Sequence, residues 1–395
     1  MVYVIGFVLL WTKPAINRWM TAHRGVLALS AVGTVGLVLV VDEFLFELIL
    51  RHHDKGEPFY WLEGVSIWPT EILRALATVL AIGYFIKAWR DLRSNSEGMT
   101  DRYGFGVPAE TGQAEGWRQY LAMVQWVLSP RGGESHEQVG TLWQRYRAAG
   151  EGRHRLTRLF LLAVIYGASF LLLWKVMGAE DLSGPCRGTF SCRIDFILVI
   201  ASYVCLVVLN LFVFDAVLLC RRWIGSLTLA ADGWPPQLIE RLALQSLDNL
   251  AKAQELMKIE LIAKRTEVVN RLVRYPFIVL LIMIVARNEY FDDWHFPLTM
   301  IVGWSANVFL ALAAALLLYR AAEQARNAAV AKLNRVVLKG LEQGTGGDAE
   351  VKLTRQVIED IEAVGRGAFV PLWQQPVVES SVYSLVALAQ YLYMN

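Results

Sequence analysis

Three carboxylates interrupt a mostly apolar stretch near the start of the chain. They are Asp42, Glu43 and Glu47 in the segment 25–50, and Glu47 follows Glu43 by four residues, on the same helix face. Charges are expensive inside a bilayer, so these acids are the first candidates for function. If copies of the chain surround a symmetry axis, the acids form a ring that attracts cations. If instead the helix leaves the lipid near Val41, they are hydrated residues of a protruding helix.

Two further segments carry charges within or beside apolar residues. Glu71 and Arg74 lie three positions apart in 69–89, so they can pair with one another, or Arg74 can reach the acids of the preceding segment. Asp215 lies within the apolar segment 194–220. With the three carboxylates, these residues are candidates for an ion pathway. In a transporter, a substrate or proton site would instead be formed by Asp42, Glu43, Glu71 and Arg74.

One segment carries a regular small and partly polar stripe. Four residues recur every four positions in the segment 298–319: Gly303, Asn307, Ala311 and Ala315. Small residues let membrane helices approach closely, so the stripe predicts a close helix contact. That contact is either within the chain, against 276–286 or 25–50, or between subunits. In an oligomer, Asn307 is also a candidate for a polar ring that lines a pore.

The four cysteines form two groups. Cys186 and Cys192 lie in the sequence GPCRGTFSC, between apolar segments, whereas Cys205 and Cys220 lie within the segment 194–220. In an oxidising compartment the first pair can form a disulfide that contributes on the order of 2 kcal/mol. Two free thiols are the alternative. A zinc site would need further His or Cys ligands, which the neighbouring sequence lacks.

Residue patterns of known enzymes are absent from the sequence. The six histidines form no HExxH motif or histidine box, and none lies within an apolar segment. GLEQGTGGD, at 340–348, lacks the GK[ST] ending of a phosphate loop, so we interpret it as a linker. The arginines of 145–155 lie beside Trp143 and Tyr146 and could contact nucleic-acid bases, but basic residues beside a membrane helix explain them without a ligand, so we do not expect nucleic-acid binding. We expect no catalysis, no cofactor and no metal ion.

The apolar segments dominate the composition. The chain has 395 residues, of which 55% are hydrophobic and 19% charged, with a mean hydropathy of +0.39 and a net charge of +2. Soluble domains carry nearer a quarter charged residues, and disordered chains or basic nucleic-acid binders carry more. A bilayer core is about 30 Å thick and a helix rises about 1.5 Å per residue, so the long apolar segments predict membrane-spanning helices. There are six of them: 25–50, 69–89, 159–174, 194–220, 276–286 and 298–319.

The basic residues predict the orientation. Lys and Arg gather at every second boundary between a span and its loop, which places both termini in the cytoplasm and leaves outer loops at 51–68, 175–193 and 287–297. The outer stretches are acidic and would concentrate cations, although the exclusion of Lys and Arg produces part of that asymmetry. The chain then divides into an N-terminal interfacial segment, three pairs of transmembrane helices and three cytosolic segments, in the order 1–23, 24–89, 90–157, 158–220, 221–275, 276–319 and 320–395.

The cytosolic segments make up about half of the chain, too much for connectors. The segment 235–274 predicts one long amphipathic helix that continues directly into the short span 276–286, because no Gly or Pro follows Pro236 until Pro276. The first ten and the last fourteen residues are apolar but too short to cross, and whether they contact the membrane stays open. The expected fold is all-α: a six-span transmembrane helical bundle with a helical cytosolic domain built from three chain segments.

Four stretches of the sequence are familiar as a set: EGVSIWPTE, FDAVLLCRRWI, YPFIVLLIMIVARNEYFDDW and GAFVPLWQQPVV. They resemble an uncharacterised group of bacterial multi-pass inner-membrane proteins. The resemblance implies a bacterial inner-membrane setting and no mechanism. The layout, a small helical bundle with a bulky cytosolic part, is also similar to that of the membrane effectors of bacterial anti-phage systems, which open or break the membrane when a cytosolic signal is sensed. This second likeness concerns layout alone.

Three functions are compatible with these features. The first is a homo-oligomeric cation channel or pore in the lipid bilayer, gated by its cytosolic helices in response to a cytosolic ligand or protein partner. The second is a secondary transporter, although no internal repeat is apparent in the sequence. The third is a non-conducting scaffold or receptor for a cytosolic partner. The long helix 235–274 would be the lever of the first mechanism.

Overall fold

The computed structural model of the chain describes residues 67–105, 138–177, 189–230, 234–235, 250–286, 298–342, 348–371 and 374. These residues form an all-α fold, as the sequence predicts. Its elements are α4 (Ile67–Tyr103), α6 (Val139–Ala149), α7 (Gly152–Met177), α8 (Thr189–Leu229), α10 (Leu250–Val285), α11 (Leu298–Glu342), α12 (Asp348–Ala363) and the 3₁₀ helix η3 (Gly367–Phe369).

Four of the described helices are long and apolar enough to cross a membrane. Their apolar stretches are His154–Leu173 in α7, Phe196–Leu229 in α8, Lys252–Val285 in α10 and Met300–Leu338 in α11. Each overlaps one of the last four predicted spans. The first predicted span, 25–50, lies outside the described residues. The second, 69–89, is helical within α4, which is not among these four helices. A multi-pass membrane protein is therefore supported, and the count of six spans stays a prediction.

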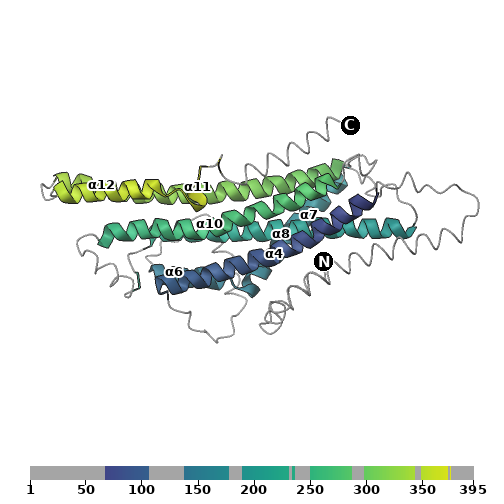
Figure 1. The fold of residues 1–395 in the computed structure, drawn as a ribbon, viewed down its shortest axis with the longest axis horizontal. Coiled ribbons are helices and arrows are strands. Elements are labelled where there is room, and N and C mark those ends of the chain that lie inside the picture. Colours follow the sequence, from purple (N-terminus) through teal and green to yellow (C-terminus); the bar gives the residue numbers. More distant parts are fainter. Residues whose placement is uncertain are drawn as a thin grey trace, which may run out of the picture.

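The long helices lie side by side along the long axis of the molecule (Figure 1). Helix α8 occupies the centre and packs against α4, α7, α10 and α11, while α12 folds back along α11. Helices α4 and α10 run antiparallel, because Tyr84 contacts Tyr275 whereas Leu92 contacts Arg265, nearer the start of α10. Parts of the three predicted cytosolic segments therefore contact one another. They do so partly through the ends of the long helices that also carry the apolar stretches.

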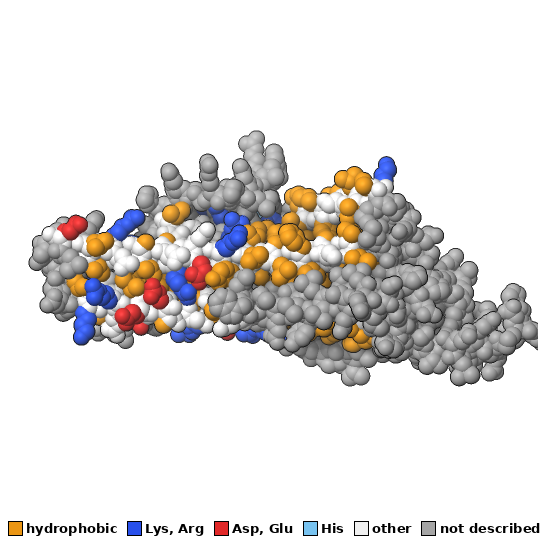
Figure 2. Space-filling view, turned by 90° about the horizontal axis from the view of Figure 1, so that it is seen from above, with side chains coloured by type: hydrophobic (Ala, Val, Ile, Leu, Met, Phe, Trp, Pro, Cys, Tyr) orange, Lys and Arg blue, Asp and Glu red, His pale blue; other side chains and the backbone are white. Residues whose placement is uncertain are grey.

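The surface of the bundle divides into two halves along the same axis. Figure 2 shows hydrophobic side chains over one half of the described surface and charged side chains over the other. We define the apolar half as residues 73–86, 159–177, 196–214, 276–285 and 300–318, and the polar half as residues 87–103, 139–158, 215–229, 250–275, 319–342 and 348–363. Exposed apolar residues such as Ile165, Leu172 and Phe309 would be unfavourable in water but are ordinary in lipid.

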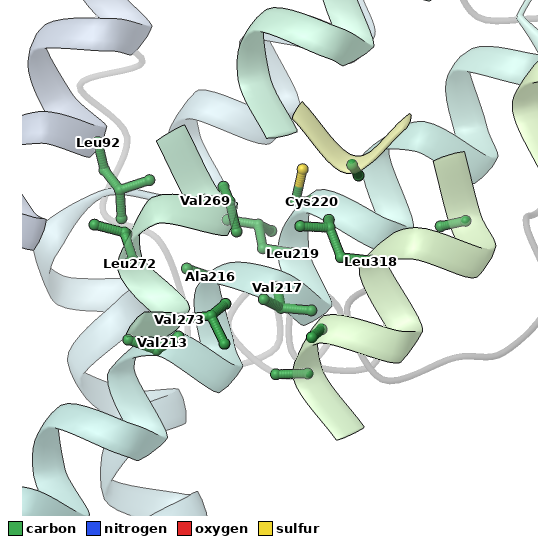
Figure 3. Packing of buried hydrophobic residues seen from close by; sticks show 14 of the residues in the cluster. Leu92, Val213, Ala216, Val217, Leu219, Cys220, Val269, Leu272, Val273 and Leu318 are labelled. Atoms are coloured by element: carbon green, nitrogen blue, oxygen red, sulfur yellow. The ribbon is translucent and has the colours of Figure 1, made fainter. Parts of the chain in front are cut away.

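The core continues without a break across the boundary of the two halves. Figure 3 shows this packing, in which Leu92 of α4, Val213 and Cys220 of α8, Val269 of α10 and Leu318 of α11 belong to one buried cluster. Buried alanines let α8, α10 and α11 approach closely. Because one core holds both halves, they are not separate domains joined by linkers.

Helix α10 confirms the predicted continuity into the short span. It runs from Leu250 to Val285 with Pro276 inside it. A proline removes one helical hydrogen bond and usually breaks a helix in water. Here the neighbouring residues Tyr275 and Phe277 are buried against other helices, so packing holds the helix together at this position. The predicted start of the helix at 235 cannot be compared, since 236–249 lie outside the described residues.

Candidate functional site

A buried cluster of charges joins α7 to α8 where the polar half begins. The guanidinium of Arg158 donates to both carboxylate oxygens of Asp215, Nε to Oδ1 at 2.6 Å and Nη2 to Oδ2 at 3.1 Å. Arg155 donates from Nε to Oδ2 of the same carboxylate at 3.1 Å. All three side chains are at most 6% exposed. We call these three residues the Arg-Asp-Arg cluster.

The cluster is well satisfied despite its net positive charge. Arg158 also donates from Nη1 to the carbonyl oxygen of Ala149 at 2.8 Å. The guanidinium carbon of Arg155 lies 4.0 Å from the centre of the Phe212 ring, a cation–π contact that offsets part of its desolvation. A bidentate pair with a buried carboxylate has strict geometry, so the cluster sets the position of α7 on α8.

Sequence reasoning singled out Asp215 but not its partners. Arg155 and Arg158 were interpreted as positive-inside residues that precede a span, and the structure gives them a second role as the counter-charges of that acid. The signal was available in principle. A carboxylate inside an apolar helix needs a cation, and two arginines three residues apart lie on one face of the preceding helix.

A further buried arginine, Arg265, joins the centre of α10 to α4 and α6. Arg265 donates from Nε to the hydroxyl of Tyr146 at 2.7 Å, and from Nη1 to Asn95 Oδ1 at 2.6 Å and to the Leu92 carbonyl at 3.1 Å. Its guanidinium carbon lies 5.1 Å from the Tyr146 ring centre. Burial raises the pKa of the Tyr146 phenol, and the adjacent Arg265 partly opposes the rise. The phenol therefore stays neutral. We call Arg265 with its partners Tyr146, Asn95 and Leu92 the Arg265 bracket, and it holds three helices of the polar half together.

The apolar half contains a neutral polar cluster from three helices. Asn307 of α11 donates from Nδ2 to the Tyr166 hydroxyl of α7 and to the Gly303 carbonyl, both at 2.9 Å. Asn210 of α8 donates from Nδ2 to the main-chain and side-chain oxygens of Asn307, at 2.9 and 3.0 Å. The hydroxyls of Tyr166 and Tyr203 are 3.0 Å apart. The Oδ1 atom of Asn210 is buried with no hydrogen-bond partner among the residues that the structure describes. We call these four side chains the Tyr-Asn cluster.

The small stripe of α11 packs within the chain. Asn307, Ala311 and Ala315 are at most 4% exposed, and α11 makes its most extensive contact with α8. A methyl group at Gly303 would lie 2.7 Å from the Tyr203 hydroxyl and 3.2 Å from the Phe170 ring. At Gly303 and Asn307 the close contact is therefore with α8 and α7, which are not the partners that the sequence predicts.

The remaining candidates from the sequence are placed only in part. Arg74 is 4% exposed. Glu71 lies in α4, but its side chain is outside the described residues, as are Asp42, Glu43 and Glu47 in full. Their proposed part in an ion pathway stays a prediction.

The predicted disulfide also stays a prediction. Cys186 lies outside the described residues, and Cys192 lies near the start of α8 rather than in a loop, with its side chain not described. Cys205 and Cys220 are free thiols. Within the described ranges, no group of three His, Cys, Asp or Glu side chains lies close enough to hold a metal ion.

The end of the described chain is seated on α10. The backbone N–H of Ala368 donates to the Thr266 hydroxyl at 3.0 Å, next to the Arg265 bracket, and Phe369 is 3% exposed. Arg326 of α11 covers Phe369, its guanidinium carbon 4.4 Å from the ring centre, and donates to the Val364 carbonyl. We call Gly367–Phe369 the C-terminal strap. It contacts α10 and α11.

Comparison with known proteins adds no assignment. No protein-family model, curated protein or solved structure matches the chain. The function is therefore argued from the buried clusters and from the continuity of the helices.

Proposed function

We propose that this protein is a homo-oligomeric ion channel of a bacterial inner membrane, opened and closed by its polar half, which lies in the cytosol. The observation that carries the proposal is the course of α10. This helix passes unbroken from the polar half through Pro276 to the end of the apolar half. At about 1.5 Å per residue its 36 residues extend roughly 54 Å, far more than the roughly 30 Å that a bilayer core requires.

Helix α10 is held at its centre by groups that can transmit force. The Arg265 bracket fixes it to α4 and α6, and Thr266 fixes it to the C-terminal strap. Pro276 lies about 15 Å further along the helix, at the entry to the apolar half. A ligand or partner that shifts the polar half therefore moves the lipid-facing part of α10 as well. Packed interfaces of this kind switch between discrete arrangements rather than deforming gradually.

Ion conduction is supported by the polar groups of the apolar half. Polar side chains within a membrane are costly and commonly mark pathways, and the Tyr-Asn cluster brings four of them together at the junction of α7, α8 and α11. The predicted acids Asp42, Glu43 and Glu47 would supply the negative charge that the cluster lacks. The likeness of layout to anti-phage membrane effectors suggests that the opening signal is a product of infection.

The test is reconstitution of the purified full-length chain in planar bilayers, with the subunit number measured in parallel. We expect an oligomer with cation currents that decrease strongly in Glu43→Gln and Glu47→Gln. Glu97→Gln is the matched control, because Glu97 is an exposed glutamate of the polar half, paired with Arg93 at 2.9 Å, and should not alter conductance. A monomer without current, or equal effects of all three substitutions, would contradict the proposal.

A secondary transporter is the second candidate, and the Tyr-Asn cluster is the observation that favours it. Transporters bind their substrates near the middle of the bilayer between packed helices, and the Oδ1 of Asn210, which has no partner within the described ranges, is available to a donor there. Substrate-coupled proton movement in vesicles, without single-channel currents and sensitive to Asn210→Leu, would select this alternative. If neither currents nor transport occur, the scaffold or receptor function remains.

A further inference from the structure

The surface where α4 meets α10 carries an aromatic pair at the boundary of the two halves. The rings of Tyr84 and Tyr275 are stacked, with centroids 4.5 Å apart and an interplanar angle of 9°. Tyr275 directly precedes Pro276, the residue at which α10 enters the apolar half. Tyrosines are enriched at the level of lipid headgroups, where one end of the ring is apolar and the other is hydrated.

Cations surround this pair from both helices. The ammonium nitrogen of Lys87 lies 5.7 Å from the centre of the Tyr275 ring. Arg271 and Arg274 precede Tyr275 on α10 and act electrostatically on its hydroxyl, as does the carboxylate of Asp91. Arg271 is weakly paired with Glu267, at 3.6 Å between two half-exposed side chains.

The positive charge of the cluster is not fully compensated. Among the described residues, neither Lys87 nor Arg274 makes an ion pair, and Lys87 is exposed. Asp91 and Glu267 are the carboxylates that an incoming anion would meet there, and the three cations Lys87, Arg271 and Arg274 outnumber them. The site thus favours a ligand that carries negative charge.

Tyr275 adds a hydrogen-bond donor that has no acceptor among the described residues. The residue is 5% exposed, and within the described part of the chain its hydroxyl is buried without a hydrogen-bond partner. Buried hydroxyls in native proteins are nearly always paired, so an orphaned one requires an explanation. An acceptor oxygen from a ligand, such as that of a phosphate, would satisfy it once the ligand draws Lys87 away from the ring.

Apolar side chains continue the site on the lipid side. Ile278 and Val285 of α10 follow Tyr275 into the apolar half, lie seven residues apart on one helix face, and are 38% and 40% exposed. Cations and a hydroxyl on one side, with exposed aliphatic groups on the other, match a molecule with an anionic head and acyl chains. Free phosphate would use only the first part of this surface.

We propose that the α4–α10 surface around Tyr275 binds the headgroup of an anionic phospholipid from the leaflet next to the polar half. The lipid phosphate lies between Lys87 and Arg274 and accepts a hydrogen bond from the Tyr275 hydroxyl, while an acyl chain follows Ile278 and Val285 along α10. Basic sites between membrane helices bind lipid headgroups in this manner. The site does not depend on whether the protein conducts ions.

The experiment is native mass spectrometry of the full-length chain in mild detergent, titrated with equal amounts of phosphatidylglycerol and phosphatidylcholine. We expect preferential retention of phosphatidylglycerol, decreased about fivefold for each cation removed in Lys87→Gln and Arg274→Gln. Tyr275→Phe should lower retention as well, because it removes the donor and keeps the ring. Lys87→Arg, which keeps the charge, should retain the lipid.

Lys175→Gln is the matched control, since Lys175 is an exposed lysine in the last turn of α7, in the apolar half. An excess of inorganic phosphate separates a lipid site from a phosphate site, and it should not displace the lipid. Equal retention of the two lipids, an equal loss in Lys175→Gln, or displacement by inorganic phosphate would each overturn the proposal. Only variants that elute at the wild-type volume in size-exclusion chromatography are compared, so that a folding defect is not mistaken for lost binding.

Discussion

Asp215 is neutralised by two arginines, so removing it leaves two buried cations without their carboxylate. Breaking a buried ion pair by removing one partner costs far more than the pair contributes relative to an apolar replacement. The neighbouring aromatic ring stabilises only Arg155, and the Ala149 carbonyl only Arg158. The Arg-Asp-Arg cluster is therefore the position at which a single uncharged substitution should matter most.

We expect Asp215→Asn to lower the free energy of unfolding by about 3 to 5 kcal/mol. Urea or SDS titration of the purified protein in detergent measures the effect. Glu267→Gln is the control, because the Glu267–Arg271 pair is half exposed and should contribute about 0 to 1 kcal/mol. Similar losses for the two substitutions would show that the cluster does not hold α7 on α8.

The Tyr146 phenol makes a pH-dependent contribution with a defined sign. Its pKa is raised by burial, so above about pH 10 the unfolded chain loses this proton while the folded chain keeps it. The stability that the hydroxyl contributes is complete below that pH and decreases as the pH rises further. The difference in Tm between wild type and Tyr146→Phe should thus shrink between pH 9 and 11. A difference that stays constant over this range would contradict the raised pKa.

At the scale of elements, the C-terminal strap depends on one glycine. Gly367 has φ of +66°, and a side chain there would collide with the Ala263 carbonyl and the Thr266 hydroxyl of α10. Left-handed backbone is unfavourable for residues with a Cβ, and here no space exists for one. The strap can be seated on α10 only because this position is glycine.

Gly367→Ala should therefore release the strap and destabilise the polar half by at least about 1 to 2 kcal/mol. Gly365→Ala is a close control, because a methyl group there would have its nearest contact at 3.8 Å. Hydrogen exchange of α12 and the Tm of the full-length protein measure the two effects. If both variants exchange like wild type, the strap is not a fixed part of the fold.

At the scale of the whole molecule, the helices are far longer than a bilayer is thick. The 41 residues of α8 and the 45 residues of α11 extend roughly 62 and 68 Å, about twice the hydrocarbon core. Each helix therefore contributes to both the apolar and the polar half. This arrangement makes the polar half a direct continuation of the membrane bundle.

The positive-inside pattern predicts which side of the membrane each cysteine faces. In intact bacterial cells, a membrane-impermeant maleimide should label Cys186 and Cys192 only after reduction, because the pair forms an outer disulfide. Cys220 is buried in the core and should not react before unfolding. Labelling of the Cys186→Ser variant without reduction is the control. Labelling that requires cell lysis would reverse the proposed orientation.

How far sequence reasoning reached differs between fold and site. The all-α class, the apolar stretches of α7, α8 and α11 and the continuity of α10 through Pro276 were predicted, because hydropathy and periodicity are local properties. Asp215 and Asn307 were singled out for the same reason, since polar residues in apolar segments are visible in one dimension. The roles of Arg155, Arg158 and Arg265 were not, because each depends on a partner from another helix.

The sequence by itself determined that the chain enters a membrane, since no fold in water can cover so many apolar residues in such long runs. It also determined where charge is costly. Only the tertiary structure decided which helices meet, and hence that Asp215 is paired by α7, that the small stripe of α11 faces α8, and that Tyr275 lies beside Lys87. The physical reason is that the free-energy cost of burying a charged or polar side chain can be estimated from that residue and its sequence neighbours. The contacts that offset this cost come from groups that only folding brings near.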